Sequence, residues 1–474
     1  MHELRNLIKN ISIYTIGNIV NKSLGFILIP IYSIYLTTDD YGIISGMTLF
    51  MSVTAVIITL SLDRAVYRCY FDYEKEDDRK VFLGTIIISL FVITSLFIIV
   101  LITFSNYVGL IFKSIPFYPY YFLTLLTLYI LTLYKITIIY FRITEQSKKY
   151  VILSISYFLV NTSLIIYFVT HLKGGAEGKI TANLLANVII LPFAFIIIKN
   201  NVTFKFDFNM LKNALAYCLP IIPSLLSAFV LNMSDRIFIE KVIDLHSLGI
   251  YSMGYQLADA LVIIGSSFYG AYNPMFLRIV NHEKEKLDYL KFIQDNYHII
   301  MIILHFLAFF FARDIFLLLI HPKFFESYRI FQLIIIANLF NSLFDIVGLS
   351  FSQGKKMLQI MYIVVTGAIL NIVLNIYFVP IYGIYGACYT TMISFIVIGV
   401  VKYIVARNYF FISWDWLNIG YFTFFIISIF GLQFLLTSGN YIYDFSVKIV
   451  LSLSLIIYYI FKIKKSILDF VKIT

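Results

Sequence analysis

Residues 11–36 read ISIYTIGNIVNKSLGFILIPIYSIYL, and this stretch decides the class of fold. It is apolar and longer than the ~20 residues that an α-helix needs to cross a bilayer. Near its middle it carries Asn18 and Lys22, which are four residues apart and therefore share one face of a helix. A lysine at the bilayer centre costs roughly 2.5–3.5 kcal/mol on insertion scales, so Lys22 is expected to face protein or water.

Two interpretations of this polar face stay open. Asn18 and Lys22 either hold neighbouring helices together through hydrogen bonds inside a bundle, or they form a cationic wall of a water-filled cavity that receives an anion. In both cases the stretch predicts a membrane helix that packs against protein on one side.

The composition supports a membrane protein throughout. The chain has 474 residues, of which 61% are hydrophobic and 13% charged. Soluble domains carry about 25% charged residues. The net charge of +10 comes from basic residues that lie between apolar runs, so we expect membrane lipids as partners and no nucleic acid.

Apolar runs of about 18–25 residues predict an all-α integral membrane fold with about twelve to fourteen transmembrane helices, fourteen if every run is counted. With the N-terminus in the cytoplasm, about three times as many Lys and Arg lie inside as outside, which obeys the positive-inside rule and places both termini in the cytoplasm. The predicted spans are 11–36, 42–62, 82–104, 118–140, 150–170, 180–198, 215–240, 249–275, 297–319, 328–350, 358–379, 384–405, 418–437 and 445–462.

The chain also repeats itself at an offset of about 207 residues. Residues 41–45 (YGIIS) recur as 248–252 (LGIYS), and residues 146–149 (QSKK) recur as 353–356 (QGKK). A six-helix unit begins and ends on the same side of the membrane, so its copy has the same orientation. We therefore predict two parallel six-helix lobes around a central cavity, residues 1–212 and 213–410, followed by two additional helices and a basic tail in 411–474.

Polar residues inside the predicted spans are the candidates for function, because ionisable groups in a membrane are costly. Asp235 and Arg236 are sequence neighbours that point in different directions, so we expect that they need not neutralise each other. For individual asparagines the simpler role is hydrogen bonding between helices, and for Arg64 it is anchoring at the cytoplasmic edge. The candidate substrate-binding residues are Asn18, Lys22, Lys135, Arg236, Arg64, Asn232 and Asn341, and the candidate ion-coupling residues are Asp235, Asp259 and Asp345.

We find no catalytic motif in the sequence and expect no enzyme. GxSxG, HExxH and P-loop patterns are absent, and the histidines and the three cysteines are too dispersed for a metal site. No cofactor is predicted, no metal ligand and no catalytic residue.

Several segments spread over the first ~405 residues carry a family resemblance. They are LTTDDYG (36–42), LDRA (62–65), YFDY (70–73), SDRIFI (234–239), LGIY (248–251), LNIVLN (370–375) and YGIYGA (382–387). These segments resemble the bacterial polysaccharide-biosynthesis flippases of the multidrug, oligosaccharidyl-lipid and polysaccharide exporter superfamily. KSLGF (22–26) is similar to an Arg-x-Leu-Gly-Phe stretch of the related lipid II flippases, but Ile29 and Pro30 stand where those proteins carry further charge, which argues against a peptidoglycan precursor as substrate.

The resemblance implies a multi-pass protein of the bacterial inner membrane that works by alternating access. Its expected substrate is an undecaprenyl-pyrophosphate-linked oligosaccharide of O-antigen, capsule or similar type, moved from the cytoplasmic to the outer leaflet, with glycan-assembly proteins as further partners. Three other hypotheses stay open. They are a multidrug or cation antiporter of the same superfamily, a membrane glycan polymerase or ligase, and a scaffold for glycan assembly that transports nothing.

Overall fold

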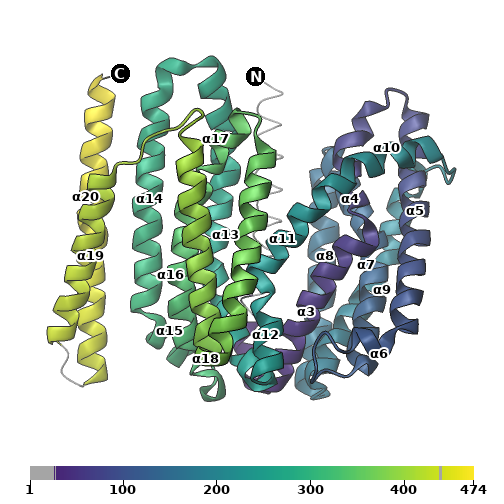
Figure 1. Ribbon diagram of the computed structural model, residues 1–474, viewed down its shortest axis with the longest axis horizontal. Helices are drawn as coiled ribbons and strands as arrows, with labels where there is room; N and C mark the ends of the chain where they lie inside the picture. Colours follow the sequence, from purple (N-terminus) through teal and green to yellow (C-terminus); the bar gives the residue numbers. More distant parts are fainter. Residues whose placement is uncertain (1–25, 27, 437–439, 474) are drawn as a thin grey trace. The chain divides into compact units, whose positions relative to one another are not determined.

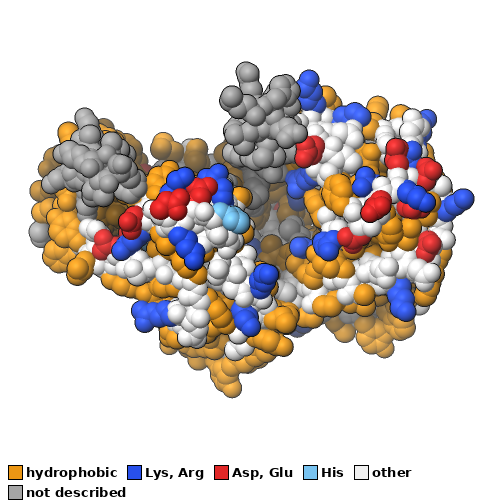
Figure 2. All heavy atoms as spheres, turned by 90° about the horizontal axis from the view of Figure 1, so that it is seen from above, with side chains coloured by type: hydrophobic (Ala, Val, Ile, Leu, Met, Phe, Trp, Pro, Cys, Tyr) orange, Lys and Arg blue, Asp and Glu red, His pale blue; other side chains and the backbone are white. Residues whose placement is uncertain are grey.

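The computed structural model describes residues 26, 28–436 and 440–473, and all regular secondary structure in these residues is helical (Figure 1). Asn18 and Lys22 lie outside the described residues. The predicted all-α fold is confirmed for the described part of the chain. At the end where α10 (Phe208–Cys218) lies, Lys, Arg, Asp and Glu side chains gather on the surface, while hydrophobic side chains dominate the flanks (Figure 2).

Eleven helical runs of the described chain are long and apolar enough to cross a membrane. The longer helices are α3 (Thr38–Thr59), α5 (Glu76–Thr103), α7 (Phe122–Ile143), α8 (Ser147–Ile166), α9 (Gly175–Ile198), α11 (Ile222–Met233), α13 (Leu245–His282), α14 (Leu287–Phe310), α16 (Ser327–Asp345), α18 (Met357–Ala406), α19 (Trp416–Leu436) and α20 (Tyr441–Ile473). Shorter helices connect them: α2 (Ile29–Tyr35), α4 (Leu62–Cys69), α6 (Ser105–Val108), α12 (Asp235–Val242), α15 (Ala312–Leu319) and α17 (Gly348–Gln353).

The 50-residue helix α18 is two spans joined by a sharp turn. At ~1.5 Å per residue a straight helix of this length would reach ~75 Å, more than twice the hydrocarbon thickness. Gly383 breaks it with φ +60° and ψ −140°, a conformation that is essentially open to glycine alone. Gly386 lies against the carbonyl of Phe378, where a side chain would not fit. The break agrees with the separate spans predicted at 358–379 and 384–405, while the total of fourteen stays a prediction.

The predicted span 215–240 overlaps the membrane-length run Phe208–Met233, and two short breaks, at Leu219–Ile221 and at Ser234, divide it into α10, α11 and α12. At the second break the Asp235 carboxylate accepts a hydrogen bond from the backbone N–H of Arg236 at 2.9 Å. Short acidic side chains compete in this way with the backbone carbonyls of a helix. This hydrogen bond coincides with the second break, and hydrophobicity alone does not register it.

The described residues fall into two compact units. The first comprises residues up to Met253 with Ile320–Phe324 and Val364–Ala387, and the second comprises Gly254–Leu319, Phe325–Ile363 and the chain from Cys388 onward. The first unit has a core between α4, α5, α7, α8, α9 and α10, and the second has a core in which α13, α14, α16, α19 and α20 take part. The predicted division at residues 212 and 410 stays a prediction.

Asp40 ties the starts of two helices of the first unit together. Its Oδ2 accepts hydrogen bonds from the backbone N–H and the hydroxyl of Thr37, and Thr37 Oγ1 accepts the Asp40 N–H in return, forming a capping box on α3. Its Oδ1 accepts the backbone N–H of Ala176 at the start of α9, at 2.8 Å. One carboxylate thus satisfies N–H groups of both helix ends.

We predict that Asp40→Ala lowers the free energy of unfolding by about 1–2 kcal/mol, because a lost N-cap costs about that much. Asp39→Ala removes the neighbouring, exposed carboxylate and should change it by less than about 0.5 kcal/mol. Thermal unfolding of both purified variants in detergent measures the difference. Equal midpoints for the two variants would contradict the double cap.

Candidate functional site

Helices α3 and α13 cross at backbone contact near their N-terminal ends. A side chain added at Gly42 would overlap the carbonyl oxygen of Leu245, and one added at Gly249 would overlap that of Thr38. All of these residues belong to the first unit. Glycine lets two backbones approach this closely in a membrane bundle. We call the contact of residues 38–45 with residues 245–252 the crossing.

The crossing joins residues that the sequence repeat makes equivalent. The Ser252 hydroxyl donates to Ser45 Oγ at 2.7 Å, and these two positions are 207 residues apart. Gly42 and Gly249 have the same spacing. An axis that relates two repeats passes midway between equivalent residues, so contacts of this kind are expected where the repeats meet. Thr38 Oγ1 and His246 Nδ1, 208 residues apart, add a hydrogen bond of 2.7 Å.

Two loops beside the crossing dock onto the opposite repeat in the same way. The Glu240 carboxylate accepts the backbone N–H groups of Lys113 and Ser114, at 3.0 and 2.5 Å. Ser33 Oγ accepts the backbone N–H of His321 at 3.2 Å. Ser33 and Glu240 occupy equivalent positions of the repeat, and so do Ser114 and His321. A side chain of each repeat thus binds a loop of the other repeat, and the two contacts together stabilise the crossing.

Lys323 strengthens the second of these loops. Its Nζ donates to the carbonyl of Ile34 at 2.8 Å, and Phe324 packs edge-on against Tyr41 with ring centroids 5.7 Å apart. Burial lowers the pKa of Lys323, and the nearby Asp40 acts in the opposite direction.

Asp235 and Arg236 lie buried at the crossing and form an ion pair with each other. Arg236 Nη1 lies 3.4 Å from Asp235 Oδ1 and donates to the carbonyl of Asn232 at 3.0 Å. Arg236 Nε donates to Ser45 Oγ at 3.0 Å. The Tyr251 hydroxyl donates to the other oxygen of Asp235. The expectation that Asp235 and Arg236 leave each other unneutralised is therefore wrong, because the long arginine side chain folds back to the carboxylate.

Buried amides extend this polar cluster along α18. The Ser234 hydroxyl donates to Asn371 Oδ1 at 3.0 Å, and Asn375 Nδ2 donates to the same oxygen at 3.0 Å. Asn371 is 1% exposed and Asn375 0% exposed; Asn371 links α18 to Ser234, and Asn375 supports it from one turn further along the same helix. The Asn232 side chain is exposed and donates to Ala228 O at 2.7 Å.

Lys135 pairs with the neighbour of Arg64 in sequence, Asp63, at a different place in the first unit. Lys135 Nζ lies 2.7 Å from Asp63 Oδ2 and remains 52% exposed. Arg64 follows Asp63 in α4 and is exposed, and within the described residues its guanidinium has no carboxylate at ion-pair distance. The structure thus brings two predicted cations beside one carboxylate, which leaves a net positive patch.

The predicted polar residues of the second unit are spread over α13, α16 and α18. Asp345 lies 3.5 Å from Lys402 Nζ and is 48% exposed. Asn341 and Asp259 are partly exposed on α16 and α13. Asn338, one turn before Asn341, is buried and donates to the carbonyl of Ala258 at 3.2 Å, so this asparagine links two helices.

Lys179 is a candidate that sequence reasoning missed, because the predicted span 180–198 begins one residue after it. It lies inside α9 and lines a small pocket of about 30 Å³ with Asn183, Thr48, Thr124 and Thr127. Within the described residues no carboxylate lies at ion-pair distance from its amine. The sequence pattern that could have identified Lys179 is its spacing of four residues from Asn183, which puts both side chains on one helix face.

These observations define a multi-pass membrane protein built from two related helical repeats, with charged and polar side chains held between its helices. The chain belongs to the family described as "Polysaccharide biosynthesis protein", whose model matches residues 7–280. This confirms the family resemblance. A relative, the Lsg locus protein 1 of Haemophilus influenzae, is 24% identical over 287 residues, which are 58% of this chain and 67% of that protein.

Two solved structures share the fold. The lipid II flippase MurJ in an inward closed conformation superposes with a TM-score of 0.74 at 13% identity, over 95% of this chain and 99% of that one. An inward-facing multidrug resistance transporter of the MATE family and MOP superfamily gives 0.62 at 14% identity, over 87% and 99%. At these identities the likeness concerns the fold.

We predict that Arg236→Ala lowers the free energy of unfolding by about 3–5 kcal/mol, because it leaves the Asp235 charge buried without its partner. Arg64→Ala serves as the control. It removes the same side chain at an exposed position and should cost less than about 0.5 kcal/mol. Thermal unfolding in detergent compares the two, and similar midpoints would mean that the buried pair does not stabilise the fold.

Proposed function

We propose that this protein is a flippase that moves a polyprenyl-pyrophosphate-linked oligosaccharide from the cytoplasmic to the outer leaflet of the bacterial inner membrane. Membership in a polysaccharide biosynthesis family and the fold shared with a lipid II flippase support the class of substrate. The observation that carries the mechanism is the crossing, where equivalent residues of the two repeats lie in contact.

The substrate explains why cations belong inside the bundle. A pyrophosphate is anionic, and its attached sugars cannot pass through hydrocarbon without a polar path. In this proposal the prenyl chain stays in lipid while cationic and amide side chains receive the headgroup. The proposed substrate contacts are Asn18, Lys22, Lys135, Arg64, Asn232 and Asn341, with Lys179 added from the structure.

Arg236 joins these residues only when the crossing opens. While α3 lies against α13, its guanidinium is shared between Ser45, Asn232 and Asp235. Separation of α3 from α13 would take the Ser45 acceptor away from Arg236 Nε, and an anionic headgroup could then take its place. Alternating access would thus couple opening of the crossing to substrate contact.

The proposal also includes the orientation of the chain in the membrane and its protein partners. Both termini are placed in the cytoplasm, so the crossing closes the outer end, and residues 1–212 and 213–410 act as the two lobes. Glycan-assembly proteins are proposed as partners, and the chain transports without chemical conversion of its substrate.

A drug or cation antiporter is the second candidate, favoured by the fold shared with a MATE transporter and by the buried Asp235. In that case Asp235, Asp259 or Asp345 would carry the coupling ion, and Asp→Asn variants would abolish drug resistance while the lysines would be dispensable.

Cross-linking the crossing tests the proposed mechanism. The Ser45 and Ser252 side chains touch, so Ser45→Cys with Ser252→Cys should form a disulfide once the buried Cys69, Cys218 and Cys388 are replaced by serine. In proteoliposomes that contain a polyprenyl-pyrophosphate-linked oligosaccharide, oxidation should stop the appearance of glycan at the outer surface, measured by lectin binding. Reduction should restore it.

Each single cysteine variant is the control, since oxidation should leave its translocation rate unchanged. A cross-linked protein that translocates at the rate of the reduced protein would overturn alternating access at the crossing. Absence of translocation by the unmodified chain, with drug export in its place, would favour the antiporter.

The proposed contact between Lys22 and the anionic headgroup can be tested separately. Lys22→Ala should slow translocation at least about tenfold, because a charge-assisted contact to the headgroup contributes roughly 1.5–3 kcal/mol. Lys22→Arg keeps the charge and should retain most of the rate. The same lectin assay measures both variants, and a normal rate for Lys22→Ala would remove this residue from the substrate site.

A further inference from the structure

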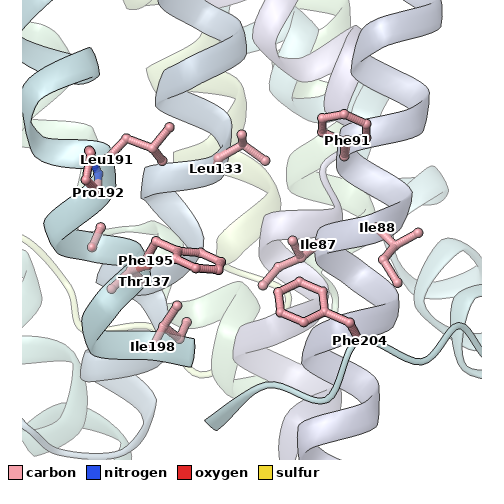
Figure 3. A pocket seen from close by; sticks show the side chains of 11 residues that line it. Ile87, Ile88, Phe91, Leu133, Thr137, Leu191, Pro192, Phe195, Ile198 and Phe204 are labelled. Atoms are coloured by element: carbon pink, nitrogen blue, oxygen red, sulfur yellow. The ribbon is translucent and has the colours of Figure 1, made fainter. Parts of the chain in front are cut away.

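An apolar groove runs along the surface of the first unit between α5, α7 and α9 (Figure 3). Its volume is about 510 Å³. Phe91, Leu133 and Leu191 line one end of it, and Phe195 and Phe204 lie toward the other end, with ring centroids 6.3 Å apart (Figure 3). The full lining is Ile87, Ile88, Phe91, Leu133, Thr137, Leu191, Pro192, Ala194, Phe195, Ile198 and Phe204.

The segment 202–207, which we call the strap, fixes one end of this groove. A side chain at Gly84 of α5 would overlap the carbonyl of Thr203, so the strap crosses α5 at backbone contact. Thr203 N donates to Lys80 O at 3.0 Å, and Thr85 Oγ1 accepts the Asp207 N–H at 3.1 Å. These bonds hold Phe204 at the groove, so this end is built by the fold.

The volume sets the size of an occupant. An apolar cavity of ~150 Å³ binds benzene, so a groove of this volume holds on the order of twenty carbon atoms. That is one acyl chain of a phospholipid. A polyprenyl chain of the length proposed for the transport substrate has more than twice as many carbons, so most of it would remain outside.

Two exposed lysines at this end of the groove determine which lipid headgroup it would favour. Lys199 follows Ile198 and Lys205 follows Phe204, so a lysine stands directly after a lining residue on both sides of this end. Both are exposed and, within the described residues, neither has an ion-pair partner. The nearest acid along the strap, Asp207, accepts the N–H groups of Asn209 and Met210 at the start of α10. The unpaired charge at the groove mouth is therefore positive.

We propose that this groove holds one acyl chain of an anionic phospholipid, whose headgroup phosphate binds Lys199 and Lys205. The apolar lining takes the chain, while Lys199 directly after α9 and Lys205 in the strap place their amines at the depth of the headgroup. This lipid is a bound component of the first unit and not the transported substrate, so the proposal does not depend on the proposed transport function.

Native mass spectrometry of the full chain tests this lipid site, with phosphatidylglycerol and phosphatidylcholine of the same acyl chains as probes. Lys199→Gln with Lys205→Gln should weaken phosphatidylglycerol binding about thirtyfold, since each of the two basic residues near a lipid surface contributes about 1 kcal/mol. Lys148→Gln with Lys149→Gln is the matched control, because it removes two exposed lysines at the start of α8 and should change the affinity less than about twofold.

A groove-filling variant tests the acyl chain. Ile88→Trp adds volume at a partly exposed lining position and should remove the tight phosphatidylglycerol adduct while leaving the unfolding temperature near that of the parent. Equal binding of both phospholipids, an equal loss in the control pair, or an adduct unaffected by Ile88→Trp would overturn the proposal. Displacement of the phospholipid by a polyprenyl phosphate would assign the groove to the prenyl chain. Glycan translocation by the same variants is read separately, so failure here leaves the transport proposal intact.

Discussion

The backbone contact between α3 and α13 is the constraint on which the rest of the first unit depends. Two glycines allow the helices to meet at their carbonyl oxygens, and everything nearby is arranged around that meeting. Equivalent serines share a hydrogen bond, and two equivalent loops each dock on the other repeat. These polar contacts hold the ends of the two helices together, and buried side chains such as Tyr41 and Leu248 pack beside them.

Charge inside the bundle is balanced locally where it is buried and left unbalanced where it is exposed. Asp235 and Arg236 neutralise each other at 2% and 7% exposure, because an unpaired buried charge would cost several kcal/mol. Lys135 pairs with Asp63 while remaining half exposed, Arg64 is exposed with no carboxylate at ion-pair distance among the described residues, and Lys179 lines a small pocket. The cations outside the buried ion pair are therefore the ones that an anionic ligand could bind without disrupting the fold.

Much of the fold follows from the sequence, because long apolar runs and a 207-residue repeat are strong signals. The all-helical class, the family and the turn near Gly383 were accessible in this way. The short break at Ser234 was not, since hydropathy does not register hydrogen bonds between side chains and the backbone. The pairing of Asp235 with Arg236 and the role of Asp40 as a double cap also depend on side-chain conformation and on contacts between distant segments. Asn18 and Lys22, on which the expected cationic face rests, lie outside the described residues.

The central claim is that the crossing opens and closes as the substrate passes. Spin labels at Ile34 and Lys241, which are exposed, equivalent positions beside the crossing, would report its state by double electron–electron resonance in lipid. The account predicts a short distance for the protein alone and a second, longer distance whose population rises when a polyprenyl-pyrophosphate-linked oligosaccharide is added. A single short distance under both conditions, in protein that translocates the glycan, would contradict it.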